Sequence, residues 1–219
     1  MEVINLSNHP SVLGCYLKEI RSSEIQKDSM RFRRNIERIG ELMAVEVSKR
    51  LSYETEQVRT PLGVAETEVI ADALVLATIM RAGLPFHQGF LQVFDRAENA
   101  FLSAYRRMSV HEGKEELEIV SEYLAAPSMD GKTLLLADPM LATGMSMEAG
   151  YKAILTHGKP VHTHLCCVLG TSDAVAYLEK CNLPDTTLWC AAIDSELNEH
   201  KYIVPGLGDA GDLCFGEKL

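Results

Sequence analysis

The apolar residues of this chain fall into short runs that alternate with stretches of helical periodicity. Five short, mainly apolar runs predict buried strands, at residues 75–80, 100–105, 134–137, 161–169 and 187–193. Helical segments are expected between several of them, at residues 87–94, 147–157 and 172–181. Strands that alternate with helices predict a parallel, right-handed α/β sheet. Ligands of such sheets bind beyond the carboxyl ends of the strands.

The chain before this pattern is expected to be largely helical. Residues 1–23 look irregular, apart from a short helical piece at residues 12–20. A helix is predicted from about residue 24 to 51, because apolar side chains recur at three- and four-residue spacing, at Phe32, Ile36, Ile39, Met43 and Val47. Its opposite face is charged, which indicates a solvated or intersubunit face. Residues 52–60, followed by a turn at 60–63, predict a hairpin or arm.

The stretch 134–149 combines a strand, a loop and the start of a helix. The apolar run ends at Asp138-Pro139, and small or hydroxyl-bearing residues follow it, at Ala142, Thr143, Gly144 and Ser146. Backbone N–H groups and the helix dipole favour an anion at such a helix start. A carboxylate such as Asp138 repels phosphate but accepts hydrogen bonds from sugar hydroxyls. The stretch therefore predicts a sugar phosphate as its ligand.

Two alternatives stand beside this interpretation. The loop lacks the Gly-Lys-Ser/Thr ending of a P-loop, so a triphosphate site fits it poorly. A strand–turn–helix connection without any ligand also remains open, because proline and small residues are common in turns.

Two arginines follow predicted strands and suit an anion site. Arg81 comes directly after the run 75–80, beside Ala82-Gly83, and Arg106 comes after the run 100–105. Two fixed guanidinium groups can bind pyrophosphate through paired N–H contacts. The alternative is that both arginines form structural ion pairs with some of the 31 acidic residues.

The C-terminal run from Tyr202 to Asp212 contains three glycines, a proline and two aspartates. Glycines let main-chain N–H and C=O groups meet the edge of a flat ligand without obstruction by side chains. Asp209 or Asp212 can hold a magnesium ion directly or through water, because magnesium favours one or two carboxylates together with phosphate oxygens. A surface turn without a ligand is the alternative.

Composition narrows the classes of function. The formal charge of −10, from 21 basic and 31 acidic residues, argues against nucleic acid or an anionic membrane as partner. No signal peptide or membrane-spanning run is recognised, and six irregularly spaced cysteines indicate reduced thiols of a cytoplasmic protein. His162, His164 and Cys166 share one face of a predicted strand, where packing is favoured over a metal site.

Taken together, these runs resemble the uracil phosphoribosyltransferases, which have the type I phosphoribosyltransferase fold. The resemblance covers essentially the whole chain and rests on four runs, at Arg81-Ala82-Gly83-Leu84, Tyr105-Arg106, Asp138 through Ser146, and Tyr202 through Asp212 with Phe215-Gly216. Asp138-Pro139, where other phosphoribosyltransferases usually have two acidic residues, indicates the uracil branch.

The resemblance implies one phosphoribosyltransferase domain of residues 1–219, in the α/β class. Its core, at about residues 65–185, would hold a parallel sheet with helices on both faces. An N-terminal helical region, a β-arm and a C-terminal base-binding hood would complete the domain, with the hood formed by the N-terminal segment and residues 186–219. A homodimer or homotetramer is expected, and GTP regulates some members of the family.

The resemblance also implies a reaction in which uracil and phosphoribosyl pyrophosphate give UMP and pyrophosphate, with Mg²⁺ as cofactor. The expected catalytic residues are Arg81, Arg106 and Asp209, and Asp209 would also contact the metal, directly or through water. Uracil would bind to Ile203, Gly208, Asp209 and Ala210. Phosphoribosyl pyrophosphate would bind to the three catalytic residues and to Asp138, Pro139, Met140, Leu141, Ala142, Thr143, Gly144, Met145 and Ser146.

Two departures from the family pattern lie near these residues. Met145 stands where the family typically has a second glycine, and Pro85-Phe86-His87 stands where small residues or methionine are usual. Two rival functions remain, a regulator on the same fold that binds UMP and RNA, and a transferase for another base such as a purine. The first would need a basic surface, against which the charge of −10 speaks.

Overall fold

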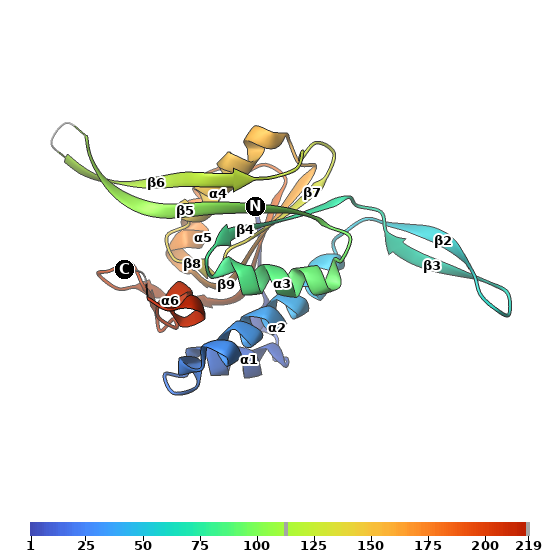
Figure 1. The fold of residues 1–219 in the computed structure, drawn as a ribbon, viewed down its shortest axis with the longest axis horizontal. Coiled ribbons are helices and arrows are strands. Elements are labelled where there is room, and N and C mark those ends of the chain that lie inside the picture. The colour runs from blue at the N-terminus through green and yellow to red at the C-terminus, as the bar shows by residue number, and fades with distance from the viewer. Residues whose placement is uncertain (112–113, 218–219) are drawn as a thin grey trace.

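A mainly parallel sheet of eight strands forms the centre of the protein. The structure is a computed structural model that describes residues 1–111 and 114–217. The side chains of residues 104–122 are not described. The strands are β1 (Glu2–Asn5), β4 (Leu74–Met80), β5 (Glu98–His111), β6 (Lys114–Ala125), β7 (Thr133–Ala137), β8 (Met140–Leu141), β9 (His162–Thr171) and β10 (Thr186–Asp194). Their order is β1-β10-β9-β7-β4-β5-β6, with β8 paired to β9 (Figure 1). Only the β5–β6 pair is antiparallel among these described strands.

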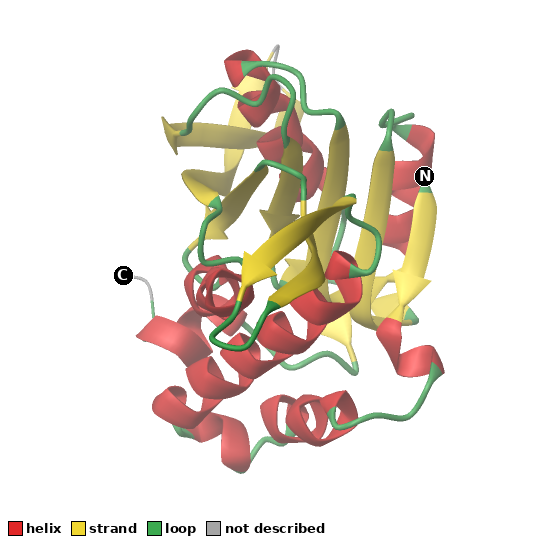
Figure 2. Cartoon of the chain, turned by 90° about the vertical axis from the view of Figure 1, so that its right-hand side faces the viewer, coloured by secondary structure: helices red, strands yellow, loops and turns green. Residues whose placement is uncertain are grey.

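Helices cover both faces of this sheet, as expected (Figures 1 and 2). One face packs against α1 (Leu13–Arg21), α2 (Ser29–Ser48), α3 (Gly83–Val93) and α6 (Ala210–Phe215). The other face packs against α4 (Met145–Ile154) and α5 (Ser172–Lys180). Single-turn helices lie at η1 (Leu6–Asn8), η2 (Ile25–Lys27) and η3 (Leu155–His157). No helix in the described part of the chain is long and apolar enough to cross a membrane.

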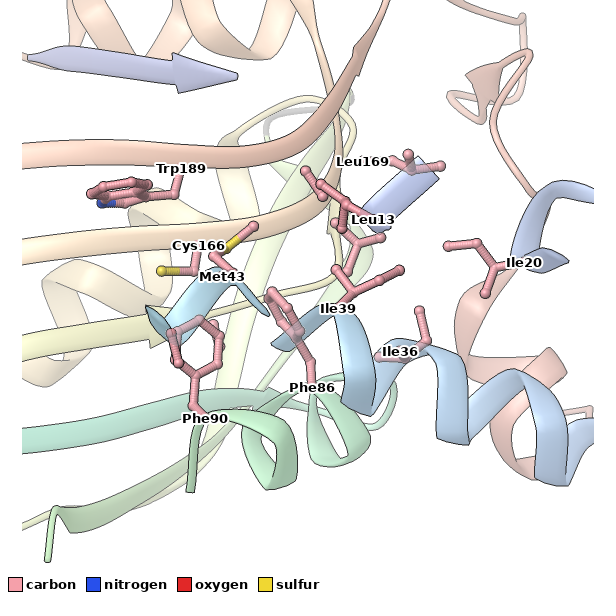
Figure 3. Close-up of a cluster of buried hydrophobic side chains, with 14 of the residues drawn as sticks. Leu13, Ile20, Ile36, Ile39, Met43, Phe86, Phe90, Cys166, Leu169 and Trp189 are labelled. Carbon is pink, nitrogen blue, oxygen red and sulfur yellow. The ribbon is translucent and has the colours of Figure 1, made fainter. Parts of the chain in front are cut away.

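Alternation along the strands divides the buried residues into two cores. Leu135, Cys166 and Trp189 point to the face covered by α2 and α3, and their sequence neighbours Leu134 and Leu165 point to the opposite face. Figure 3 shows the first core, where Ile36, Ile39 and Met43 of α2 meet Phe86 and Phe90 of α3. The apolar stripe predicted for the long helix is therefore confirmed, with every one of its five side chains at most 1% exposed.

The N-terminal region differs from the prediction in two places. Residues 1–23 are not irregular throughout, because β1 pairs in parallel with β10 at the edge of the sheet. The long helix begins at Ser29 and not at residue 24, because the side chain of Asp28 accepts a hydrogen bond from the N–H of Arg31 and caps the helix there. Both β1 and β10 lie outside the range 65–185 expected for the core, so the sheet extends beyond that range.

The predicted arm is confirmed as an antiparallel pair, β2 (Tyr53–Arg59) and β3 (Val64–Ile70). It projects away from the sheet and helices (Figure 1). Nearly all of its side chains are exposed, including the apolar side chains of Val58, Leu62 and Val64. Within this chain, the arm therefore has little packing to hold it.

The three residues on one face of β9 are engaged in packing or hydrogen bonds within the chain. His164 is 2% exposed, and its Nδ1 accepts a hydrogen bond of 3.1 Å from Trp189 Nε1. Cys166 is buried in the first core, and His162 Nε2 lies 3.1 Å from Thr187 Oγ1. Among the described residues there is no group of three or more His, Cys, Asp or Glu side chains that could hold a metal ion. The preference for packing is confirmed.

The buried imidazole of His164 gives a prediction about stability at acidic pH. Burial, helped by the neighbouring His162, lowers the pKa of His164 from 6.5 to about 4. The unfolded chain takes up a proton at this site below about pH 6.5, whereas the folded protein does not do so until about pH 4. Stability from this group is thus fully present above pH 6.5 and falls as the pH drops towards 4, by about 3 kcal/mol in total.

The measurement is the free energy of unfolding by urea at about pH 7 and about pH 4.5, for the natural protein and for His164→Gln. The variant is expected to lose less stability than the natural protein between the two pH values. Equal losses in the two proteins would show that His164 does not contribute to this pH dependence.

Candidate active site

A cavity of about 850 Å³ lies at the carboxyl ends of the central strands, and three distant segments of the chain form most of its lining. The end of β4 contributes Ile79, Met80, Arg81 and Ala82, and the segment after β7 contributes Asp138, Met140, Ala142 and Ser146. The C-terminal segment contributes His200 through Ile203 and Gly208 through Gly211. The predicted convergence of the small-residue loop, Arg81 and the C-terminal glycine loop at one edge of the sheet is therefore confirmed.

The loop between β7 and α4 is fixed by backbone contacts to β9. The N–H of Asp138 donates to the carbonyl oxygen of Cys166 at 3.0 Å, and the carbonyl oxygen of Pro139 accepts from Val168 and Leu169. Thr171, which caps α5, donates from Oγ1 to the carbonyl oxygen of Ala142 at 2.7 Å. A loop held at this many points keeps its N–H groups in fixed directions, as an anion site requires.

Gly144 allows this loop to turn directly into α4. Its φ is +82°, in the left-handed region, and a Cβ atom there would lie 2.8 Å from the ring of Tyr177. Tyr177 donates in turn to a carboxylate oxygen of Glu148 in the first turn of α4. Hydrogen bonds from Lys152 and Tyr177 lower the pKa of Glu148, so this carboxylate stays ionised. Packing of α5 against the loop thus explains why position 144 is a glycine.

Helix α4 begins at Met145, two residues earlier than predicted. Because Met145 is already helical, its backbone conformation accommodates a side chain at the position where the family typically has a second glycine. Ser146 faces the cavity in the first turn, where backbone N–H groups have no acceptor within the helix. Five residues expected to bind the sugar phosphate are absent from the lining of the cavity, at Pro139, Leu141, Thr143, Gly144 and Met145. Leu141 instead packs into the second core.

Arg81 reaches across the cavity to the C-terminal segment. Its Nη2 donates to Asp212 Oδ1 at 2.8 Å, and its Nη1 donates to the carbonyl oxygen of Gly216 at 3.1 Å. Its buried Nε has no hydrogen-bond partner among the described residues. Gly211 permits this approach, because a Cβ atom at that position would lie 3.3 Å from Arg81 Nη2. The Met80–Arg81 peptide bond is cis.

The sequence predicted that Arg106 follows the end of a strand, and this prediction is wrong. Strand β5 continues past residue 105 to His111, and Arg106 pairs with Ile119 of β6 in a long antiparallel ribbon. The side chain of Arg106 lies outside the described residues, so its role stays a prediction. The apolar run 100–105 ends where β5 leaves the core, and this change from apolar to polar residues resembles a strand end in the sequence.

The C-terminal loop is held by a buried carboxylate. Asp194, at the end of β10, accepts two hydrogen bonds from Arg21, at 2.7 and 2.8 Å, and one from the N–H of Gly206 at 3.0 Å. Arg21 also donates to the carbonyl oxygen of Gly206 at 3.1 Å. All four residues expected to contact uracil line the cavity just beyond this anchor, at Ile203, Gly208, Asp209 and Ala210.

We expect Arg21→Ala to raise the KM for the ligand of the glycine loop roughly tenfold, because a bidentate pair around a buried carboxylate orders that loop. The effect on kcat should be smaller, since Arg21 does not line the cavity. Arg31→Ala is a matched control, because it removes a bidentate pair with Glu19 and Arg31 does not line the cavity. Steady-state kinetics with a similar KM in Arg21→Ala and Arg31→Ala would contradict this role.

The carboxylates of the cavity suit a metal ion that arrives with its ligand. Asp138 and Asp209 both line the cavity, and Asp209 Oδ1 accepts from the N–H of Asp212 at 3.0 Å, which caps α6. Asp212 itself is paired with Arg81. Magnesium is commonly bound by one or two carboxylates plus phosphate oxygens, and this set fits that arrangement better than a site built entirely from protein ligands.

The sequence did not single out every residue of the cavity. Ser103, on β5, and His200, Lys201 and Gly211 also line it. Gly211 belongs to the glycine-rich run, but His200 and Lys201 carry no local pattern that marks them. Their position depends on a short hairpin of β11 (Glu196–Leu197) and β12 (Ile203–Val204), whose turn brings them to the cavity.

Comparison with known proteins identifies the family of the chain. The family model of uracil phosphoribosyltransferase matches residues 6–217. A uracil phosphoribosyltransferase of Porphyromonas gingivalis W83 is 52% identical over 219 residues and 100% of both chains, and one of Pyrococcus furiosus is 34% identical over 93% of this chain and 85% of that protein. The solved structure of the AQ2163 protein from Aquifex aeolicus superposes with a TM-score of 0.86 over 99% of both chains, at 28% identity. The chain belongs to the uracil phosphoribosyltransferase family and has the type I phosphoribosyltransferase fold.

Proposed function

We propose that the protein transfers the phosphoribosyl group of phosphoribosyl pyrophosphate to uracil, giving UMP and pyrophosphate. The observation that carries this proposal is the shared cavity of the phosphate loop, Arg81 and the C-terminal glycine loop. In the reaction, a bond forms between a uracil ring nitrogen and the anomeric carbon, the bond from that carbon to pyrophosphate breaks, and the ring nitrogen loses its proton to the pyrophosphate or to solvent.

The loop from Asp138 to Ser146 would hold the ribose 5-phosphate. The start of α4 offers backbone N–H groups and the hydroxyl of Ser146 to the phosphate, supported by the helix dipole. Asp138 would accept hydrogen bonds from the ribose hydroxyls at the end of β7. Pro139, Leu141, Thr143, Gly144 and Met145 do not line the cavity, so they would act through their main chain or by shaping the loop.

Arg81, together with Arg106, would bind the pyrophosphate. As pyrophosphate departs, positive charge develops on the sugar and negative charge grows on the leaving group. Guanidinium groups aimed at that growing charge bind the transition state more tightly than the substrate, and this difference accelerates the reaction.

Ile203, Gly208, Asp209 and Ala210 would bind uracil, largely through the main chain. A backbone N–H that donates to the 4-oxygen of uracil would meet the amino donor of cytosine, and the unpaired buried groups would disfavour that base. Holding the uracil nitrogen in line with the anomeric carbon adds a large rate effect through proximity.

Magnesium would enter with the pyrophosphate of the substrate, and Asp209 would contact it directly or through water. When bound, Mg²⁺ supplies positive charge that neutralises the leaving group. Asp209 is already oriented by its bond to the N–H of Asp212.

The exposed arm β2–β3 supports a homodimer or homotetramer, since Val58, Leu62 and Val64 would be covered by a second copy of the chain. Regulation by GTP and a cytoplasmic location stay predictions from the sequence.

The decisive assay measures labelled UMP formed from labelled uracil, phosphoribosyl pyrophosphate and Mg²⁺, with cytosine and purine bases as competitors. We expect labelled UMP to form, and we expect cytosine and purine bases to leave its yield unchanged. Preference for a purine would contradict the choice of base. Tight binding of pyrimidine-operon RNA with negligible UMP synthesis would favour the regulator.

A further inference from the structure

We infer that Lys201, in the turn between β11 and β12, binds the anionic sugar pyrophosphate at the cavity. This inference rests on the proposed function, because it assigns a further binding residue to the same reaction. Lys201 lines the cavity together with Arg81, Asp138 and Ser146, although it lies far from all three in the sequence.

The turn that carries Lys201 is rigid for its length. Asn198 Oδ1 accepts from the N–H groups of His200 and Tyr202, at 3.0 and 2.9 Å. The N–H of Lys201 donates to the carbonyl oxygen of Asn198, and the N–H of Asn198 donates to that of Tyr202, both at 2.9 Å. Lys201 is thus presented to the cavity from a fixed backbone.

The backbone of Lys201 is in the left-handed region, with a φ of +63°. Glycine and asparagine adopt this conformation more easily than lysine does. Folding alone therefore favours another residue at position 201, and the lysine is best explained by what its side chain does.

Acidic side chains predominate around the cavity, so a further cation there would favour binding of an anionic substrate. Asp138, Asp209 and Asp212 are acidic, and the guanidinium of Arg81 is already paired with Asp212. Lys201 is exposed and forms no ion pair with the described residues. In a chain of net charge −10, a free ammonium at the cavity offsets repulsion of a highly charged anionic substrate.

The two substrates separate this role from a general effect on the site. Uracil is neutral near pH 7, whereas phosphoribosyl pyrophosphate carries several negative charges. A cation that binds the substrate from an exposed position should lower the KM for the anionic substrate and leave the KM for uracil unchanged. Its effect on the KM for the anionic substrate should be smaller at high salt.

The test compares Lys201→Asn, Lys201→Gly and Lys201→Arg. Asparagine and glycine suit the left-handed backbone and remove the charge, whereas arginine keeps the charge. Lys180→Asn, on the exposed end of α5, is the matched control because it removes one lysine outside the cavity. The measurements are kinetics with each substrate varied, at about 20 and 200 mM KCl, and direct titration of phosphoribosyl pyrophosphate without uracil.

We expect Lys201→Asn and Lys201→Gly to weaken binding of phosphoribosyl pyrophosphate roughly fivefold at low salt, and less at high salt. Lys201→Arg and Lys180→Asn should remain within about twofold of the natural protein. Unchanged binding in both charge-removing variants would overturn the inference. Weak binding in Lys201→Asn but not in Lys201→Gly would also overturn it, because the backbone and not the charge would then be responsible.

The titration separates this inference from the proposed function. A natural protein that binds phosphoribosyl pyrophosphate with the expected dependence on Lys201, yet forms no UMP, would refute the choice of base and keep the role of Lys201. UMP formation with no dependence on Lys201 would keep the function and refute the role.

Discussion

Replacing Arg81 with alanine is expected to lower kcat for UMP synthesis by roughly two to three orders of magnitude. Among the described residues, Arg81 is the one arginine that lines the cavity. Its guanidinium would interact with the negative charge that grows on the departing pyrophosphate. Its ion pair with Asp212 is about one-third exposed on both sides, so its loss should cost the fold little. The measurement is steady-state kinetics combined with thermal unfolding.

Two further variants separate catalysis from packing. Arg81→Lys keeps the charge but loses the planar fork, and it should recover only part of the rate. Arg33→Ala is the matched control, because Arg33 also donates to the C-terminal segment, at the carbonyl oxygen of Cys214, without lining the cavity. A rate in Arg81→Ala close to that in Arg33→Ala would show that Arg81 is misassigned.

Asp209→Asn is expected to lower kcat/KM for phosphoribosyl pyrophosphate roughly a hundredfold, because it removes a carboxylate from the expected metal and substrate site. Asparagine caps helices as well as aspartate does, so the bond to the N–H of Asp212 and the start of α6 should persist. The loss should therefore appear in the kinetics and not in the melting temperature.

The control for this prediction is Asp28→Asn, the same substitution at another helix start. Asp28 caps α2 through the N–H of Arg31, and it does not line the cavity. We expect Asp28→Asn to have the same kcat/KM for phosphoribosyl pyrophosphate as the unsubstituted protein. A near-natural rate in Asp209→Asn as well would contradict a role for its charge in the reaction.

Much of the site could be predicted because its main parts are local in sequence. The strand, loop and helix at 134–149 carry their own signals, since an apolar run, a proline and a glycine before a helix each restrict the backbone. The glycine-rich C-terminal loop is similarly visible. The position of this loop beside the phosphate loop could also be predicted, because the carboxyl ends of parallel strands share one edge of the sheet.

Other features depend on contacts between distant residues and left no local signal. β6 was not predicted, because its sequence is rich in charged residues and gives no apolar run. The anchor of Arg21 on Asp194 joins residues 173 positions apart. Lys201 reaches the cavity through a hairpin turn whose geometry is set by the side chain of Asn198.

A crystal structure of the protein with bound UMP tests the central claim most directly. The account predicts that the phosphate lies at the start of α4 beside Ser146, and that the pyrimidine lies against Ile203 and Gly208 through Ala210. UMP bound with its phosphate and base outside this shared cavity would contradict the account.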